Sequence, residues 1–377
     1  MTENSDIRKV MIVVDSRATW SRAKTVCEEI KKRNDLELQL VLTGPISKKS
    51  EVDGFLVDNY LTVDSYSTMA RQVSDIVGEL SALIDDSRPN VVVSVTDRYE
   101  SLAVAVAASL SNVHLAHIQG GEVSGSIDES IRHAITKLAH IHFPANLDSA
   151  NRIERMGEDP RFIYNVGCPA TDLLLRVDTG KSTTVHLSGP KGKPAQPYVL
   201  VSYNPVTTQT LKENRRAIAE TLMACDGCGF KTIVVGPNHD PGSVGIWEVT
   251  QFTADVMRHA DRHWLETHQS LPHNEFICLM AHASVLVGNS SAGIREACYF
   301  GTPVVNVGTR QFLRSRTKNV VTIHNPTKDK IKDVIEAQIE HGPYDIERPY
   351  GNGGAGRKIA EILATMELPP IQKTIRY

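Results

Sequence analysis

The chain has 377 residues, of which 41% are hydrophobic and 23% charged, and its formal net charge is −3. This length and composition predict a globular protein with two domains of ordinary size. There is no basic excess and no cationic amphipathic stretch, which argues against a nucleic-acid partner and against binding to a membrane surface. The polar N-terminus and the short first apolar run predict neither a signal peptide nor a membrane span, so we expect a cytoplasmic protein.

The six cysteines are scattered along the chain. Cys225 and Cys228 form a CxxC pair, but no second pair accompanies them, so the sequence does not predict a zinc site. We therefore expect free thiols in a reducing compartment.

Short β-branched runs alternate with helical patterns in the first half of the chain. Strands are predicted at 10–14, 36–42, 90–95 and 114–118, and helices at 21–33, 69–84 and 102–110. This alternation is typical of βαβ units on a parallel sheet that is covered on both faces. Between 178 and 197 the composition changes to Gly, Pro, Lys, Ser and Thr, which predicts a linker.

The second half repeats this organisation. Strands are predicted at 198–202, 231–236, 284–288 and 303–307, and helices at 212–225, 276–283 and 292–300. We therefore predict an α/β protein of two Rossmann-like, doubly wound domains with an interdomain cleft, since ligands bind beyond the carboxyl ends of parallel strands. The predicted boundaries are 1–177 for the first domain, 178–197 for the linker, 198–355 for the second domain and 356–377 for a C-terminal segment. No GxGxxG follows a first strand, so the dinucleotide fingerprint is missing.

A candidate anion site lies in the segment 287–296, VGNSSAGIRE, which runs from a predicted buried strand through a polar turn into a helix. Ser290 and Ser291 fall at the helix start, where free backbone N–H groups and hydroxyls suit a diphosphate. The alternative is that Asn289 or Ser290 only caps the helix. Glu296 is either an acceptor for ribose hydroxyls or a solvated carboxylate.

Two arginines also follow predicted strands. Arg310 comes after the strand 303–307, and Arg17 comes after the strand 10–14. Arginine is suited to bidentate contact with phosphate, although each residue alone is also compatible with an ordinary surface position.

Candidate acid–base residues follow two other predicted strands. Asp97 and Arg98 come after the strand 90–95, and Gln119, Glu122 and Asp128 come after the strand 114–118. Ser126 and Glu129 form an S-x-x-E capping box, which places the helix start near Ile127 and Asp128 in its first turn. The helix dipole favours an ionised carboxylate there, as a base requires. The alternatives are helix-end stabilisation by Asp128 and loop bracing by Asp97.

The chain resembles the hydrolysing UDP-N-acetylglucosamine 2-epimerases from about residue 10 to 355. The motifs that carry the resemblance occur in the family's order: SRA, TDR, HIQGGEVSGSIDESIRHAITKLAHIHF, NPVTT, GPNHDPGS, VGNSSAGIREA and GTRQ. The resemblance implies a GT-B-like fold with a UDP-sugar between two Rossmann-like domains and a C-terminal helix crossing back to the first. It also implies conversion of UDP-GlcNAc and water into ManNAc and UDP, in sialic-acid-type biosynthesis, by a homodimer or homotetramer.

The chemistry implied by the resemblance is C1–C2 elimination followed by rehydration with inversion at C2, which needs no metal or other cofactor. Asp97 and Asp128 match catalytic carboxylates of the family. The segment 119–122, QGGE, fits the hydrolysing branch, because the non-hydrolysing relatives typically carry E-A-G-x-R there. The positions that match nucleotide contacts are Arg17, Arg98, Asn204, Ser290, Ser291, Glu296 and Arg310.

Several positions depart from the family pattern. Gln119 stands where a catalytic Glu often occurs, so its proton-exchange role must pass to Glu122, a neighbouring His or water. Asn204 replaces a His, Thr19 replaces an Asp, and a His usual soon after Thr43 and Gly44 has no counterpart. These departures suggest two alternatives, an epimerase for a UDP-2,4-diacetamido-trideoxyhexose of the bacillosamine–legionaminic type or a catalytically inactive UDP-sugar binder. The segment GNSSAGIREA argues against a GT-B glycosyltransferase.

Overall fold

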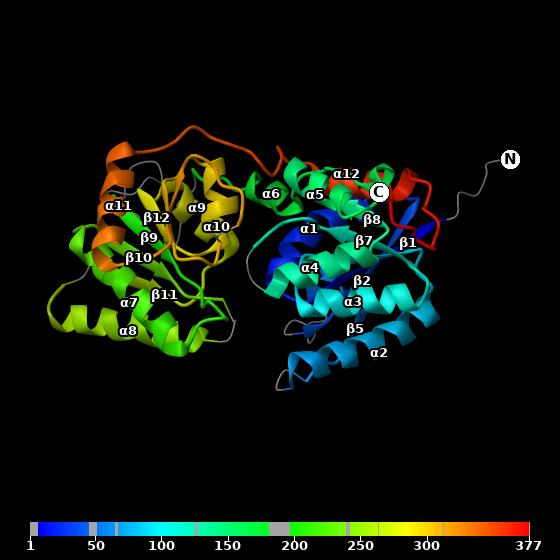
Figure 1. Cartoon of the computed structure of the whole chain (residues 1–377), viewed down its shortest axis with the longest axis horizontal. Coiled ribbons are helices and arrows are strands. Elements are labelled where there is room, and N and C mark those ends of the chain that lie inside the picture. Colours follow the sequence, from blue (N-terminus) through cyan, green and yellow to red (C-terminus); the bar gives the residue numbers. More distant parts are fainter. Residues whose placement is uncertain are drawn as a thin grey trace. The chain divides into compact units, whose positions relative to one another are not determined.

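The computed structural model describes residues 7–44, 51–64, 67–124, 127–180, 197–238, 242–262, 264–311 and 313–376. The chain divides into two compact units, which are coloured along the sequence in Figure 1. The first unit comprises residues up to Val123, Ile127–Leu175 and the segment from Tyr350 onward, and the second comprises Arg176–Pro349 with 124–126. Residues 181–196 of the predicted linker and Ser126 of the predicted capping box lie outside the described residues.

The first unit is built on a six-stranded parallel sheet in the order β5-β2-β1-β6-β7-β8. Its strands are β1 (Arg8–Val14), β2 (Leu36–Leu42), β5 (Asn59–Tyr60), β6 (Val91–Val95), β7 (His114–Ile118) and β8 (Ile141–Phe143). Its helices are α1 (Arg17–Lys31), α2 (Met69–Ser87), α3 (Tyr99–Leu110), α4 (Ile127–Leu138), α5 (Leu147–Arg155), α6 (Pro169–Leu174) and α12 (Ala355–Thr365). A short hairpin, β3 (Glu51–Val52) with β4 (Phe55–Leu56), precedes β5.

Alternation along β1 places its side chains in two separate cores, one on each face of the sheet. Val10, Ile12 and Val14 pack with buried residues of α1 and α12. Met11 and Val13 pack with buried residues of α2 and α3 on the opposite face. A parallel strand covered by helices on both sides must be apolar at consecutive positions. This explains the uninterrupted hydrophobic run at 10–14.

The C-terminal segment joins the first unit through a buried carboxylate. Asp172 accepts backbone N–H groups from Ala355 at 3.0 Å and Gly356 at 2.8 Å, and the Thr25 hydroxyl donates to it at 3.2 Å. A Cβ atom on Gly356 would lie 2.6 Å from the backbone of Thr25, so a glycine is required where α12 meets α1. Asp172 thus satisfies the free N–H groups at the start of α12 and holds this helix on the first unit.

Replacing Asp172 with alanine is expected to destabilise the first unit by about 2–4 kcal/mol, because two buried N–H groups lose a charged acceptor. The measurement is the midpoint of urea unfolding. Thr327→Ala is the matched control, because Thr327 caps the more exposed α11 through Lys330 N. An equal, small loss in both variants would contradict this role of Asp172.

The second unit has the same strand order, β11-β10-β9-β12-β13-β14, and again all pairs are parallel. Its strands are β9 (Tyr198–Ser202), β10 (Lys231–Val235), β11 (Leu265–His268), β12 (Val285–Gly288), β13 (Val304–Val307) and β14 (Val320–Ile323). Its helices are α7 (Leu211–Gly227), α8 (Ser243–His259), α9 (His273–His282), α10 (Ser291–Arg295) and α11 (Lys328–His341). Both sheets follow the order of a doubly wound Rossmann fold, so the predicted fold class is confirmed. Within the described part of the chain, no helix has the length and apolar character that a membrane span requires.

Several predicted helix boundaries differ from the structure, and two of the differences concern candidate site residues. The first helix begins at Arg17 rather than near residue 21, because Ser16 and Thr19 form a reciprocal capping box. The predicted helix 292–300 is split: α10 ends at Arg295, Glu296 is its C-cap residue, and a 3-10 turn spans Ala297–Tyr299. Arg17 therefore lies in the first turn of a helix, and Glu296 lies at a helix break.

Candidate active site

The sheet register brings the predicted acid–base residues of the first unit together. Val95 at the end of β6 pairs with Ile118 at the end of β7, so Asp97 and Gln119 emerge from adjacent strand ends. Two residues at this edge, Thr96 (φ 70°) and Gln119 (φ 66°), adopt the left-handed backbone conformation that non-glycine residues rarely use. Strain of this kind concentrates where a structure positions functional groups.

His117 braces this strained edge from inside the fold. Its Nε2 lies 2.7 Å from the carbonyl oxygen of Thr96, and its Nδ1 lies 3.3 Å from the Thr136 hydroxyl. Burial lowers the pKa of His117 to about 3, although its hydrogen bond to Thr96 opposes this shift. His117 is fully buried and both of its ring nitrogens are engaged, so in this structure it supports the backbone at Thr96.

Arg132 of α4 contacts groups from two loops at this edge of the sheet. Its side chain is 1% exposed, its Nη2 contacts the Asp97 carboxylate, and its Nη1 donates to the backbone oxygen of Glu122 at 2.8 Å. The same helix carries Asp128 in its first turn. One buried arginine thus ties the loop after β6 and the loop after β7 to the helix that bears the third candidate carboxylate.

The Gln119 side chain is held on both sides. Arg22 Nε donates to its Oε1 at 2.8 Å, and its Nε2 donates to the Cys168 sulfur at 2.7 Å. The amide is therefore fixed with its oxygen toward a cation, which is where a carboxylate would also be stabilised.

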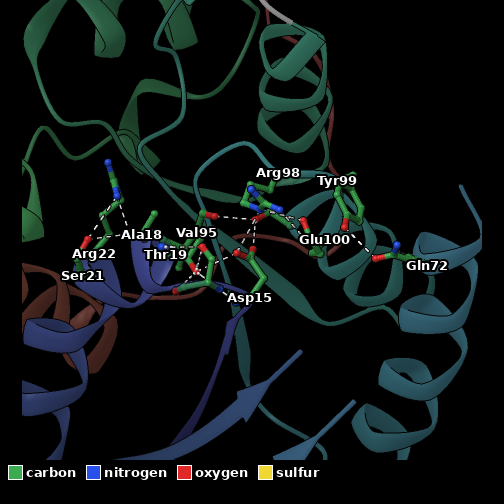
Figure 2. Close-up of polar contacts among 12 residues, drawn as sticks. Asp15, Ala18, Thr19, Ser21, Arg22, Gln72, Val95, Arg98, Tyr99 and Glu100 are labelled. Carbon is green, nitrogen blue, oxygen red and sulfur yellow. Dashed lines mark hydrogen bonds and ion pairs between the residues drawn. The ribbon is translucent and has the colours of Figure 1, made fainter. Parts of the chain in front are cut away.

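The end of β1 holds a second group of charged residues. Arg17 is exposed at the start of α1, whereas Asp15 is 3% exposed and accepts from the Thr19 hydroxyl at 3.0 Å. Arg98 pairs with the buried Glu100 and lies 3.5 Å from Asp15. Figure 2 shows Asp15, Arg98 and Glu100 pointing toward one another, with Thr19 beside Asp15.

In the second unit, Asn289 organises the predicted nucleotide-contacting residues. Its Oδ1 accepts from Asn204 N at 2.7 Å, and its Nδ2 donates to Asn204 O at 2.8 Å, which joins the loops after β9 and β12. Its backbone oxygen accepts from Arg310 Nη1 at 3.3 Å and from Gln311 Nε2 at 3.2 Å. The preceding Gly288 has φ 140°, and a Cβ there would lie 2.1 Å from Ser202 O, so only glycine fits between the two strands.

The other predicted residues of this unit lie on or beside α10. Ser290 caps α10 by accepting from Ala292 N at 3.3 Å, as the capping interpretation expected. Ser291 begins the helix and is partly exposed, as is Glu296. Asn204 uses its Oδ1 to accept from Asn238 N at 2.9 Å, so this side chain braces a loop in addition to any ligand contact.

Sequence reasoning missed Arg132, Glu100 and Asn289 as organisers of the two edges. Arg132 and Glu100 are charged yet fully or almost fully buried, and no spacing in the sequence marks them. No cluster of three or more His, Cys, Asp or Glu side chains suited to a metal ion occurs among the described residues.

Two doubly wound units in one chain are the architecture of GT-B-like folds. Solved structures of this class agree over nearly the whole chain. A Methanocaldococcus jannaschii UDP-GlcNAc 2-epimerase in complex with UDP-GlcNAc and UDP gives a TM-score of 0.78 at 18% identity, covering 94% of this chain and 99% of that one. The Neisseria meningitidis UDP-GlcNAc 2-epimerase bound to UDP-GlcNAc gives 0.77 at 18% identity, with the same coverage.

The family model described as UDP-N-acetylglucosamine 2-epimerase matches residues 28–364. The chain therefore belongs to the UDP-N-acetylglucosamine 2-epimerase family. A UDP-N,N'-diacetylbacillosamine 2-epimerase (hydrolyzing) from Legionella pneumophila is 31% identical, covering 96% of this chain and 97% of the relative. A UDP-N-acetylglucosamine 2-epimerase from Neisseria meningitidis serogroup B is 30% identical, covering 95% and 94%.

Proposed function

We propose that this chain is a hydrolysing UDP-GlcNAc 2-epimerase, which converts UDP-GlcNAc and water into ManNAc and UDP in sialic-acid-type sugar biosynthesis. The observation that carries this proposal is the junction at Arg132, which gathers Asp97, the Glu122 loop and the helix bearing Asp128 at one edge of the first sheet. Elimination next to a diphosphate needs a positioned general base, and a carboxylate can serve as one.

In the proposed first step, a carboxylate of the first unit removes the C2 proton of the sugar. The C–H electron pair forms the C1–C2 double bond, and the C1–O bond breaks with its electrons going to the diphosphate of UDP. Water then adds across the double bond, with its hydroxyl on C1 and a proton on the opposite face of C2, which inverts that centre. Asp128 is proposed as the base, with Asp97 and Glu122 handling the other protons.

The departing diphosphate needs electrostatic stabilisation, which is usually the largest contribution to such catalysis. We assign this role to Ser290, Ser291 and Arg310 of the second unit and to Arg17 and Arg98 of the first. Asn204 and Glu296 complete the proposed nucleotide contacts.

A diacetamido sugar is the second candidate substrate. Relatives from Legionella pneumophila and Campylobacter jejuni are named as 2-epimerases for N,N'-diacetylbacillosamine nucleotides. The departures from the family pattern at Gln119 and Thr19 lie in the first unit, which we propose faces the sugar, and they favour a sugar altered from GlcNAc.

The test is to incubate the purified protein in D₂O with UDP-GlcNAc and with UDP-N,N'-diacetylbacillosamine. We expect UDP release and, by NMR, a 2-epimerised free sugar with one deuterium at C2, because solvent replaces the hydrogen lost in elimination. The better substrate identifies the sugar. Binding of both nucleotides without UDP release would instead indicate the inactive binder.

Gln119→Glu is expected to raise the rate of UDP release from UDP-GlcNAc by up to ~100-fold, because a carboxylate exchanges protons and an amide does not. Arg22 Nε would hold the new carboxylate where it now holds Oε1. Initial rates of UDP release on both substrates check this, with Gln119→Ala as the control for loss of the side chain. An unchanged or lower rate on UDP-GlcNAc would show that Gln119 does not set this preference.

A further inference from the structure

Arg98 is held by two buried carboxylates at the start of α3 (Figure 2). Its Nε and Nη2 donate to the two oxygens of Glu100, each at 3.1 Å, and its Nε also lies 3.5 Å from Asp15 Oδ1. The Glu100 side chain is fully buried and that of Asp15 is 4% exposed, whereas the Arg98 side chain is 34% exposed. One edge of the guanidinium is therefore anchored in the protein, and the residue extends toward solvent.

The free edge of this guanidinium is available to a ligand. Within the described part of the chain, Arg98 Nη1 has no hydrogen-bond partner, although a guanidinium carries five N–H donors. The residue sits where β1 and β6 are neighbours and the strand order reverses, which is the usual ligand position in open α/β sheets. An arginine whose planar fork is fixed on one side is pre-organised to receive an anion on the other.

When both are ionised, the carboxylates of Asp15 and Glu100 carry two negative charges, whereas Arg98 carries one positive charge. Burial and the neighbouring Glu100 raise the pKa of Asp15 to about 6, against the effect of Arg98 and of the hydroxyls of Ser16 and Thr19. Ser101 also donates to Asp15 at 3.3 Å. Buried charges are kept only where they are paired. Here two buried carboxylates share one arginine, whose own side chain is partly exposed. This arrangement fixes the direction of Arg98 more than it stabilises the fold.

We propose that Glu100, supported by Asp15, is a positioning residue that orients Arg98 toward the diphosphate of the nucleotide sugar. This inference rests on the proposed function, since Arg98 is assigned there to the nucleotide. Glu100 and Asp15 themselves act only through Arg98. Asp15 also supplies a carboxylate beside Thr19, the position at which the family resemblance led us to expect an aspartate.

The test is a double-mutant cycle on UDP affinity, measured by calorimetry without turnover. Glu100→Gln is expected to weaken UDP binding roughly tenfold, because the amide offers one acceptor and no charge to the guanidinium. Arg98→Met is expected to weaken it at least as much. The double variant should bind UDP no more weakly than Arg98→Met, because without Arg98 the Glu100 side chain has no guanidinium to orient.

Two further variants separate positioning from a general structural effect. Glu100→Asp keeps the charge and is expected to bind UDP more tightly than Glu100→Gln but less tightly than the native protein. It replaces Glu100→Gln in the cycle if Glu100→Gln does not fold. Asp35→Asn is the matched control, because Asp35 makes the same two-point contact with Arg33 at a partly exposed position away from the candidate site residues and should leave UDP affinity unchanged.

Additive losses in the double variant, no loss in Glu100→Gln, or no loss in Arg98→Met would each overturn the inference. These results do not depend on catalysis. A protein that releases no UDP from any substrate, yet shows the non-additive cycle, would refute the proposed reaction and leave the role of Glu100 intact.

Discussion

Asp128→Asn is expected to reduce turnover by a factor on the order of 10²–10⁴, because the amide cannot accept the C2 proton. Asparagine keeps the size of the side chain and its position in the first turn of α4, so the fold is expected to be unaffected. UDP affinity should remain within a few-fold of the native value, because the proposed nucleotide contacts lie on other residues. Initial rates of UDP release and calorimetric titration with UDP measure the two quantities separately.

Glu129→Gln is the matched control for Asp128→Asn. Glu129 is the next residue in the same helical turn, and it pairs with His133 at 3.8 Å. This control should retain its turnover. If Asp128→Asn also retained turnover, Asp128 would be removed as the base, and Glu122 or Asp97 would have to take that role.

Arg132→Met is expected to lower both stability and activity. The free energy of unfolding should fall by about 3–5 kcal/mol, because the variant removes the buried cation that contacts the Asp97 carboxylate. The value of kcat/KM should fall by roughly 100-fold or more, because Asp97 and the Glu122 loop lose the group that fixes their positions. Urea unfolding measures the first effect, and UDP-release kinetics recorded under conditions where the variant is folded measure the second.

Arg132→Lys distinguishes charge from geometry at the same position. Lysine keeps the cation but lacks the planar fork that reaches Asp97 and Glu122 together. We expect this variant to recover most of the stability and only part of the activity. Full activity in Arg132→Met, with a folded protein, would show that the Asp97 and Glu122 loops are positioned by other contacts.

The sequence by itself determined the fold class and the positions at which several strands end. The predicted strands 36–42, 114–118 and 198–202 coincide with β2, β7 and β9, because each is a short run rich in Leu, Val or Ile that is closely flanked by polar or turn-forming residues. Strand ends also located the candidate residues, since chemistry at an open α/β sheet follows its carboxyl ends. Local signals were weaker at helix ends, where the capping box of Ser16 and the break at Glu296 were missed.

Only the tertiary structure decided which buried charges hold these residues in place. Arg132 and Glu100 lie in helices whose sequences give no sign that these two positions face inward, and each meets its partner through contacts that depend on the packing of the first sheet. Asn289 likewise joins two loops that are 85 residues apart in the sequence. Pairings of this kind arise when strand order brings distant segments together, and a hydrophobic pattern records burial but not the partner of a buried polar group.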